Sequence, residues 1–139
     1  MKIQELRIPA AGTWARDCAL IKLIESEKQP LQFEYNKDSD DSHWRIVFNT
    51  VIGYKVTSEE FTMTSYLREL PNGDYYIYEI IDSPWLEEFK NITEKELFEK
   101  LKHYVFCLYD ETIEVLSDKF TAEKINQEEE SELQENEQK

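Results

Sequence analysis

The feature that most constrains the fold is residues 101–120, LKHYVFCLYDETIEVLSDKF, a pattern that predicts two strands joined by a tight turn. Side chains alternate between the faces of a strand, which places His103 and Val105 on one face and Phe106 on the other. Because both faces of the first strand are largely apolar, we expect it to lie in the middle of a sheet. The polar residue Asp110 favours the turn between the two strands.

Further strand patterns lie before this stretch. They cover residues 2–8, 17–25, 31–36, 43–56, 60–70 and 75–81. The run at 43–56 exceeds the usual length of a strand, so we expect a bend or bulge near Gly53. Residues 17–25 also fit a buried helix, because a short apolar run is ambiguous by period alone. A capping-box pattern at Thr57 and Glu60 leaves the segment that follows open between helix and strand.

Two short helices are predicted between the last of these strands and residue 101. Ser83 followed by Pro84 is a typical helix start, with a capping side chain and a proline at the first helical position. Thr93 and Glu96 form a second capping-box pattern. Apolar residues at helical spacing follow each start, so we expect each helix to bury one face.

Together these elements predict an α+β fold, with a curved, mostly antiparallel sheet of about six or seven strands and one or two late helices. A sheet this rich in aromatic residues must bury one face, so we expect it to curl or to be covered by the helices. Residues 1–125 are long enough to form a single domain with its own core. Residues 126–139 are charged and nearly without apolar side chains, which predicts a disordered acidic tail.

The net charge indicates which classes of partner the chain favours and disfavours. The chain has 30 acidic residues against 16 basic ones, a net charge of −14, and the predicted tail holds only part of this excess. Contacts to phosphates need clustered lysine and arginine, so the charge disfavours nucleic acid as a partner, and it equally disfavours an anionic membrane. The charge favours a basic partner through electrostatic steering, although acidity also serves solubility alone.

The cysteines and the lack of long apolar segments bear on the compartment. Cys18 and Cys107 lie in apolar runs, so we expect buried free thiols, since a disulfide between them would need an oxidising compartment. The first residues lack the apolar core of a secretory signal, and no apolar run is long enough to span a membrane. We therefore expect a cytoplasmic protein.

Few residues are candidates for catalysis. Each of the two histidines, His43 and His103, begins a predicted strand, where a general-base role and a structural role both fit. His103 and Cys107 share a face but lie about 13 Å apart, too far for a base and its nucleophile. A pairing of His43 with Cys18 or Cys107 across strands stays open. No calcium, zinc, phosphate-binding or dinucleotide motif occurs, so we assign no catalytic residue, metal or cofactor.

Aromatic residues are too numerous for one face of a sheet to bury. Tyrosine and tryptophan among acidic residues are typical of protein interfaces, although the same rings also fill cores. We therefore assign candidate binding roles to aromatic residues and to the two histidines. These residues are Trp85, Tyr66, Tyr76, Tyr78, His43 and His103.

Four short motifs lie along residues 44–118. They are a Trp-x-x-x-Phe strand from Trp44 to Phe48, a Ser-x-aromatic segment at Ser83 and Trp85, a His-Tyr strand at His103 and a Glu-Val-Leu strand at Glu114. In these motifs the chain resembles small uncharacterised proteins of mainly Gram-positive bacteria. Acidic proteins of this type are similar to immunity proteins of polymorphic toxin systems. The resemblance implies a protein partner and assigns no catalytic residue.

Three functional hypotheses follow. The first is a small acidic binding protein of the immunity type, which docks onto a basic toxin or another protein through aromatic residues rimmed by acids. The second is a ligand-binding or enzymatic domain with a pocket near His43 and His103. The third is a phage-like or structural accessory protein, which the sequence does not separate from the first. A homodimer formed through an edge strand also stays open.

Overall fold

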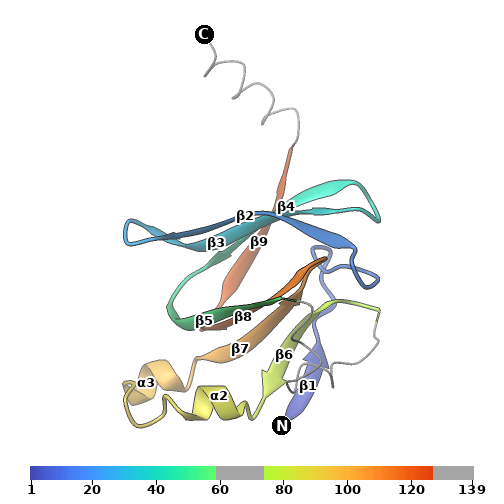
Figure 1. Cartoon of the computed structure of the whole chain (residues 1–139). Coiled ribbons are helices and arrows are strands. Elements are labelled where there is room, and N and C mark those ends of the chain that lie inside the picture. The colour runs from blue at the N-terminus through green and yellow to red at the C-terminus, as the bar shows by residue number, and fades with distance from the viewer. Residues whose placement is uncertain (59–73, 127–139) are drawn as a thin grey trace.

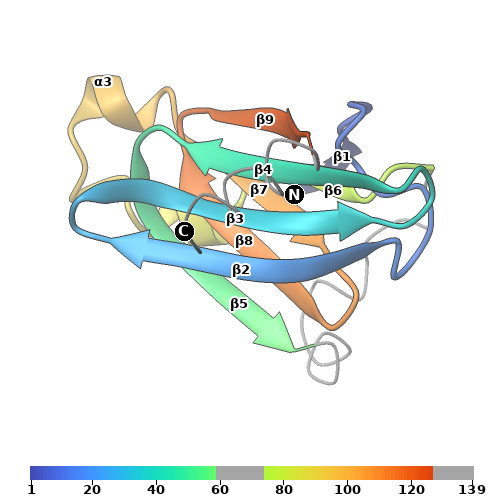
Figure 2. The same ribbon diagram turned by 90° about the horizontal axis from the view of Figure 1, so that it is seen from above.

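The computed structural model describes residues 1–58 and 74–126 and folds them into two antiparallel sheets that pack face to face (Figure 1 and Figure 2). The five-stranded sheet has the order β1 (Lys2–Glu5), β6 (Ile77–Ile81), β7 (Lys102–Cys107), β8 (Glu111–Ser117) and β5 (Val51–Ser58). The four-stranded sheet has the order β2 (Cys18–Ser26), β3 (Gln29–Lys37), β4 (Ser42–Phe48) and β9 (Phe120–Ile125). Two short helices, α2 (Pro84–Glu87) and α3 (Lys95–Phe98), connect β6 to β7.

The mostly antiparallel fold is therefore confirmed, but the strands are more numerous than predicted and form two sheets instead of one. The second sheet covers the aromatic face that was expected to need burial. Four phenylalanine rings interlock between the two sheets. The ring of Phe106 lies 5.1 Å from Phe33 and 5.6 Å from Phe48, edge to face in both pairs. Phe120 packs against Phe106 at 5.3 Å. The outer face of the five-stranded sheet carries a second, smaller apolar cluster of Tyr78, Ile80 and Val105 beside its polar side chains.

The prediction of a single strand at residues 43–56 is wrong. The chain turns at Asn49 and Thr50, so β4 lies in one sheet and β5 in the other. Asp118, in the turn between β8 and β9, holds this crossing together. Its Oδ1 atom accepts hydrogen bonds from the N–H groups of Thr50 and Lys119, each at 2.9 Å. Its Oδ2 atom accepts one from Nδ2 of Asn49 at 2.8 Å.

Local predictions near these strands have mixed outcomes. β7 lies in the middle of its sheet, as its two apolar faces predict, and a register shift between Val51 and Gly53 confirms the irregularity expected there. Ser83 caps α2, accepting a hydrogen bond from the N–H of Leu86 at 3.2 Å. The second capping box is wrong, because Glu94 precedes α3 and makes no side-chain cap hydrogen bond.

One strand was missed and two predictions lie outside the described residues. The sequence did not predict β9, because its half-buried residues Phe120 and Ile125 stand at its two ends with exposed residues between them. The predicted strand at residues 60–70 lies outside the described residues. So does the predicted acidic tail, except for Asn126.

Candidate functional site

A buried hydrogen-bonded network lies on the outer face of the five-stranded sheet, with His103 at its centre. The pairing of β7 with β8 makes His103 and Glu114 diagonal neighbours on this face. Nε2 of His103 lies 2.8 Å from Oε1 of Glu114, and Nδ1 lies 2.7 Å from Oγ of Ser83. His103 and Glu114 are each 1% exposed, and Ser83 is 4% exposed. The network therefore ties the loop before α2 to two inner strands of the sheet.

Lys55 and Trp85 complete this network. Lys55 stands directly opposite Glu114 on β5, with its Nζ atom 3.8 Å from Oε2 of Glu114. The same Nζ atom lies 4.3 Å from the centre of the Trp85 ring, which packs edge to face with His103 at 5.1 Å between ring centroids. A Cβ atom added to Gly53 would lie 3.4 Å from Cζ2 of Trp85. The indole therefore packs directly on the backbone of β5.

The hydrogen bonds of the network are consistent with one direction of proton donation. The Oγ atom of Ser83 accepts the N–H of Leu86, which leaves its hydroxyl proton for Nδ1 of His103. Nε2–H of His103 then donates to Glu114. A serine, a histidine base and an acid in this order are the parts of a nucleophilic relay. Because Ser83 is buried and already caps α2, the network is better placed to hold the helix against the sheet than to supply a nucleophile.

A second histidine–glutamate pair lies on the outer face of the four-stranded sheet. Nε2 of His43 lies 3.1 Å from Oε1 of Glu34, again as a diagonal neighbour, here between β4 and β3. Oε2 of Glu34 lies 3.1 Å from Nζ of Lys22 and 3.7 Å from Arg45. Glu34 is 1% exposed, so three basic side chains surround a buried carboxylate.

Residues 84–100, here called the helical lobe, protrude from the five-stranded sheet (Figure 1). None of them is buried, although they include six large apolar side chains. These six are Trp85, Leu86, Phe89, Ile92, Leu97 and Phe98. Ile92 is 78% exposed, more than any other exposed large apolar side chain among the described residues. The lobe also contains five glutamates against three lysines, so its apolar side chains lie among acids.

The two cysteines do not provide a reactive thiolate. Both are free thiols, Cys18 buried and Cys107 half-buried, so the expected free state is confirmed. Burial and then the charge of Asp17 raise the pKa of Cys18 to about 12, and burial and then Glu114 raise the pKa of Cys107 to about 12. A thiol with such a pKa stays protonated at neutral pH, which argues against a cysteine–histidine dyad.

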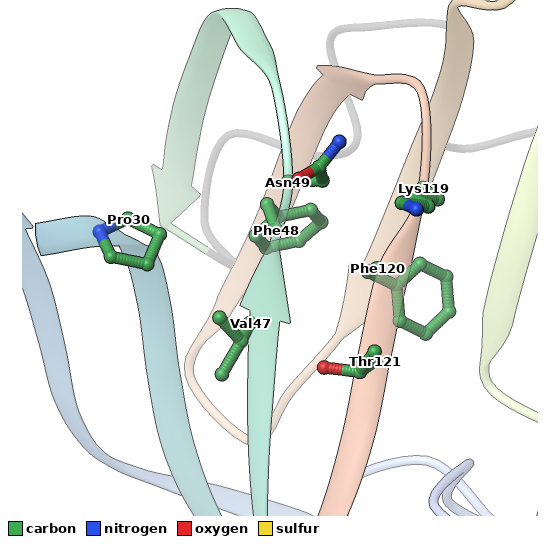
Figure 3. Close-up of a pocket in the computed structure, with 7 residues that line it drawn as sticks. All are labelled: Pro30, Val47, Phe48, Asn49, Lys119, Phe120 and Thr121. Atoms are coloured by element: carbon green, nitrogen blue, oxygen red, sulfur yellow. The ribbon is translucent and has the colours of Figure 1, made fainter.

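Two open hollows lie at the end of the sandwich where β4 crosses to β5. The larger, of about 460 Å³, lies between β5 and the hairpin of β2 and β3, and its lining includes Glu25 and Tyr54. The smaller, of about 230 Å³, is lined mainly by apolar side chains, including the rings of Phe48 and Phe120 (Figure 3). Neither hollow is lined by a histidine, so neither is the pocket expected near His43 and His103.

The predicted binding residues occupy different environments. Trp85 belongs to the helical lobe and is half-buried, and the structure brings it together with His103. His43 lies in the other sheet, 5% exposed, and Tyr78 is 0% exposed. Tyr76 is half-buried, with its ring centroid 6.4 Å from that of Tyr78. Tyr66 lies outside the described residues.

Sequence reasoning did not assign roles to Glu114, Lys55 and Glu34. For Glu114 a signal existed, because a turn at Asp110 folds its strand back beside the strand of His103. Alternation alone cannot pair the two residues, since the register also depends on the length of the turn. Lys55 and Glu34 carried no local signal. The strand of Lys55 pairs with β8, which is distant in sequence, and Glu34 is one of several polar residues on the same face of β3.

Comparison of the chain with protein-family models, with curated proteins and with solved structures found no match. Fold and site therefore define the class on their own: a two-sheet antiparallel sandwich with a helical lobe anchored by a buried Ser–His–Glu network. Among the described residues, no helix is long and apolar enough to cross a membrane. In the same part of the chain, no group of three or more His, Cys, Asp and Glu side chains could hold a metal ion.

Proposed function

We propose that this chain is a small acidic binding protein that docks onto a basic protein through its helical lobe, in the manner of an immunity protein. The observation that carries the proposal is the accessibility of the lobe, where Ile92 is 78% exposed and five further large apolar side chains are half-buried instead of buried. Accessible apolar side chains gathered on one protruding segment and rimmed by polar residues are typical of an interaction surface.

The anchor beneath the lobe supports this proposal. Two helices of four residues each are too short to be stable alone in water. Ser83 and Trp85 fix the start of the lobe on His103, so its surface is ordered before a partner arrives. Such preorganisation strengthens binding, because less conformational entropy is lost on association.

The charge supports a basic partner. The chain carries a net charge of −14, and the lobe itself has more glutamates than lysines. Opposite charge on the partner would raise the association rate, and this increase would be lost at high salt. A basic toxin fits this requirement, as the resemblance to immunity proteins implies.

Capture from a lysate of the host cell, read by quantitative mass spectrometry, tests the proposal. The variant Ile92→Lys places a positive charge on the most exposed apolar side chain of the lobe, and Ile21→Lys is the matched control on β2, where Ile21 is 47% exposed. We expect wild type and Ile21→Lys to capture the same basic protein, and Ile92→Lys to weaken its binding at least about tenfold. Equal capture by both variants, or a captured protein that is acidic, would contradict the proposal.

A second candidate function is acyl hydrolysis, favoured by the line of Ser83, His103 and Glu114. The burial of Ser83 and its role as a cap oppose it. A fluorophosphonate probe tests it directly, because such probes label only an activated serine. Labelling of Ser83 that disappears in His103→Gln would favour hydrolysis, and an unlabelled wild-type protein would exclude it.

A further inference from the structure

The larger hollow has the chemistry of a site for a basic side chain. It measures about 460 Å³ and lies beside β5, at the edge of the five-stranded sheet. Leu31, Val51 and Ile52 contribute apolar side chains to its lining, and Glu25 and Tyr54 contribute polar ones. The hydroxyl of Tyr54 donates a hydrogen bond to the carboxylate of Glu25, which holds that carboxylate at the hollow.

Glu25 is exposed, unlike the two buried glutamates, and among the described residues its carboxylate has no basic neighbour of the kind that each of them has. Lys22 lies 3.1 Å from Glu34, and Lys55 lies 3.8 Å from Glu114. In the part of the chain that the structure describes, no lysine or arginine pairs with Glu25. A lysine or arginine side chain entering the hollow would place its methylene groups on the apolar lining and its charge at this carboxylate.

The edge of β5 offers backbone groups next to the hollow. β5 pairs with β8 on one side, and on its other side no strand of the described residues pairs with it. Unpaired N–H and C=O groups on an edge strand can accept an added strand. This edge lies close to the helical lobe at Gly53. A Cβ atom added to Gly53 would lie 3.4 Å from Trp85 and 3.8 Å from Phe89. A partner on the lobe would therefore reach the edge without a long linker.

We infer that an extended basic segment of the partner adds to β5 as a strand and inserts a lysine or arginine side chain into the hollow. This inference rests on the proposed function, because it names a second contact of the same basic partner. It differs from that function in its residues, since Glu25 and Tyr54 lie outside the helical lobe.

Titration of the full-length ¹⁵N-labelled protein with the synthetic peptide acetyl-TVKVT-amide, followed by NMR, tests this inference. We expect the amide signals of residues 51–54 to shift. A peptide with norleucine in place of lysine should bind at least about tenfold more weakly, because it keeps the apolar chain but lacks the charge. Glu25→Gln should weaken binding of the lysine peptide by a similar factor. Glu27→Gln is the matched control, because it removes the same charge from a residue outside the hollow lining.

Three results would overturn the inference: no shift at residues 51–54, equal binding of the two peptides, or equal effects of Glu25→Gln and Glu27→Gln. The last result would mean that the peptide responds to net charge alone. The variant Ile92→Lys separates this inference from the proposed function. If it abolishes capture of the partner while Glu25→Gln leaves peptide binding unchanged, the lobe binds and the hollow does not. If it leaves capture unchanged, the proposed function fails.

Discussion

The two sheets carry the same arrangement of charged side chains on their outer faces. In each sheet a histidine is the diagonal neighbour of a buried glutamate, His43 with Glu34 and His103 with Glu114. A basic residue stands directly opposite each glutamate, Arg45 in the four-stranded sheet and Lys55 in the five-stranded sheet. Both sheets therefore compensate a buried carboxylate with the same cross-strand arrangement of a histidine and a basic residue.

The difference lies in what each network holds. Around Glu34, the long side chains of Lys22 and Arg45 are 52% and 36% exposed, and they can turn toward water. Around Glu114, His103 continues to Ser83, and the helical lobe begins there. The network of Glu34 therefore compensates a buried charge within its own sheet, whereas the network of Glu114 also fixes the start of the helical lobe.

Removal of each glutamate should give the largest effect and should separate the two networks. Glu114→Ala leaves His103 buried without its partner and loosens the lobe, so we expect the free energy of unfolding to fall by about 3–5 kcal/mol. Glu34→Ala also removes the partner of the buried His43. It should nevertheless lower the free energy of unfolding by only about 1–3 kcal/mol, because Lys22 and Arg45 can be solvated and the helical lobe does not depend on this pair. Urea denaturation followed by circular dichroism measures both values. Equal losses would mean that the lobe adds nothing to the second network.

Much of this architecture could be predicted from local pattern. Alternation of side chains predicted the hairpin of β7 and β8 and the central place of β7, and Ser83 with Pro84 predicted the start of α2. Alternation could not reveal the two sheets, because it continues through the turn at Asn49 and Thr50 as if the strand were unbroken. Local chemistry is visible in the sequence, whereas the layer to which each strand belongs is decided by long-range packing.

The candidate site was harder to predict for the same reason. Trp85 and His103 were both singled out, but as separate candidates, and the structure places their rings in contact, with His103 bound to Glu114. Their relation depends on strand register and on the path of the chain after β6. Neither can be deduced from a single residue, so the sequence could not predict that Trp85 and His103 lie in contact.

Loss of the serine hydroxyl should have the next largest effect. Ser83→Ala removes the cap of α2 and the hydrogen bond to His103, and we expect it to lower the free energy of unfolding by about 1–2 kcal/mol. The matched control is Ser42→Ala, since Ser42 is equally buried in the four-stranded sheet and accepts a hydrogen bond from Nε1 of Trp44 at 2.8 Å. Hydrogen exchange should become faster at residues 84–100 only in Ser83→Ala. Unchanged exchange there would show that the network does not anchor the lobe.

Substitution of Gly53 probes the contact between β5 and the lobe with a smaller effect. The added Cβ atom of Gly53→Ala would meet Trp85 at an ordinary contact distance, and the unfolded chain would lose freedom. We expect the free energy of unfolding to rise by about 0.4–1 kcal/mol. Gly53→Val adds two more carbons toward the indole and should instead be destabilising. If both variants raise the melting temperature, Trp85 does not pack on this strand as the structure shows.

The smallest expected effect concerns the joint between the two sheets and appears only in acid. Partial burial acts to raise the pKa of Asp118, but hydrogen bonds from Thr50, Asn49 and Lys119 outweigh it and hold the pKa below its ordinary value. An acid whose pKa is lowered in the folded state stabilises it at neutral pH, and this stabilisation is lost as the pH falls through the folded pKa. Asp118→Asn should therefore be less stable at neutral pH and should lose less stability on acidification.

Asp40 offers the matched control for this prediction, because its pKa is also lowered but its turn joins two strands of the same sheet. Burial again acts to raise that pKa and is outweighed by hydrogen bonds from Ser42 and by Lys37. Urea denaturation between about pH 2 and pH 7 compares Asp40→Asn with Asp118→Asn. We expect both variants to lose less free energy of unfolding than wild type on acidification. Faster amide hydrogen exchange in β5 only in Asp118→Asn would show that Asp118 connects the sheets. If Asp118→Asn leaves the loss of stability in acid unchanged, the packing of the phenylalanine rings and not Asp118 holds the two sheets together.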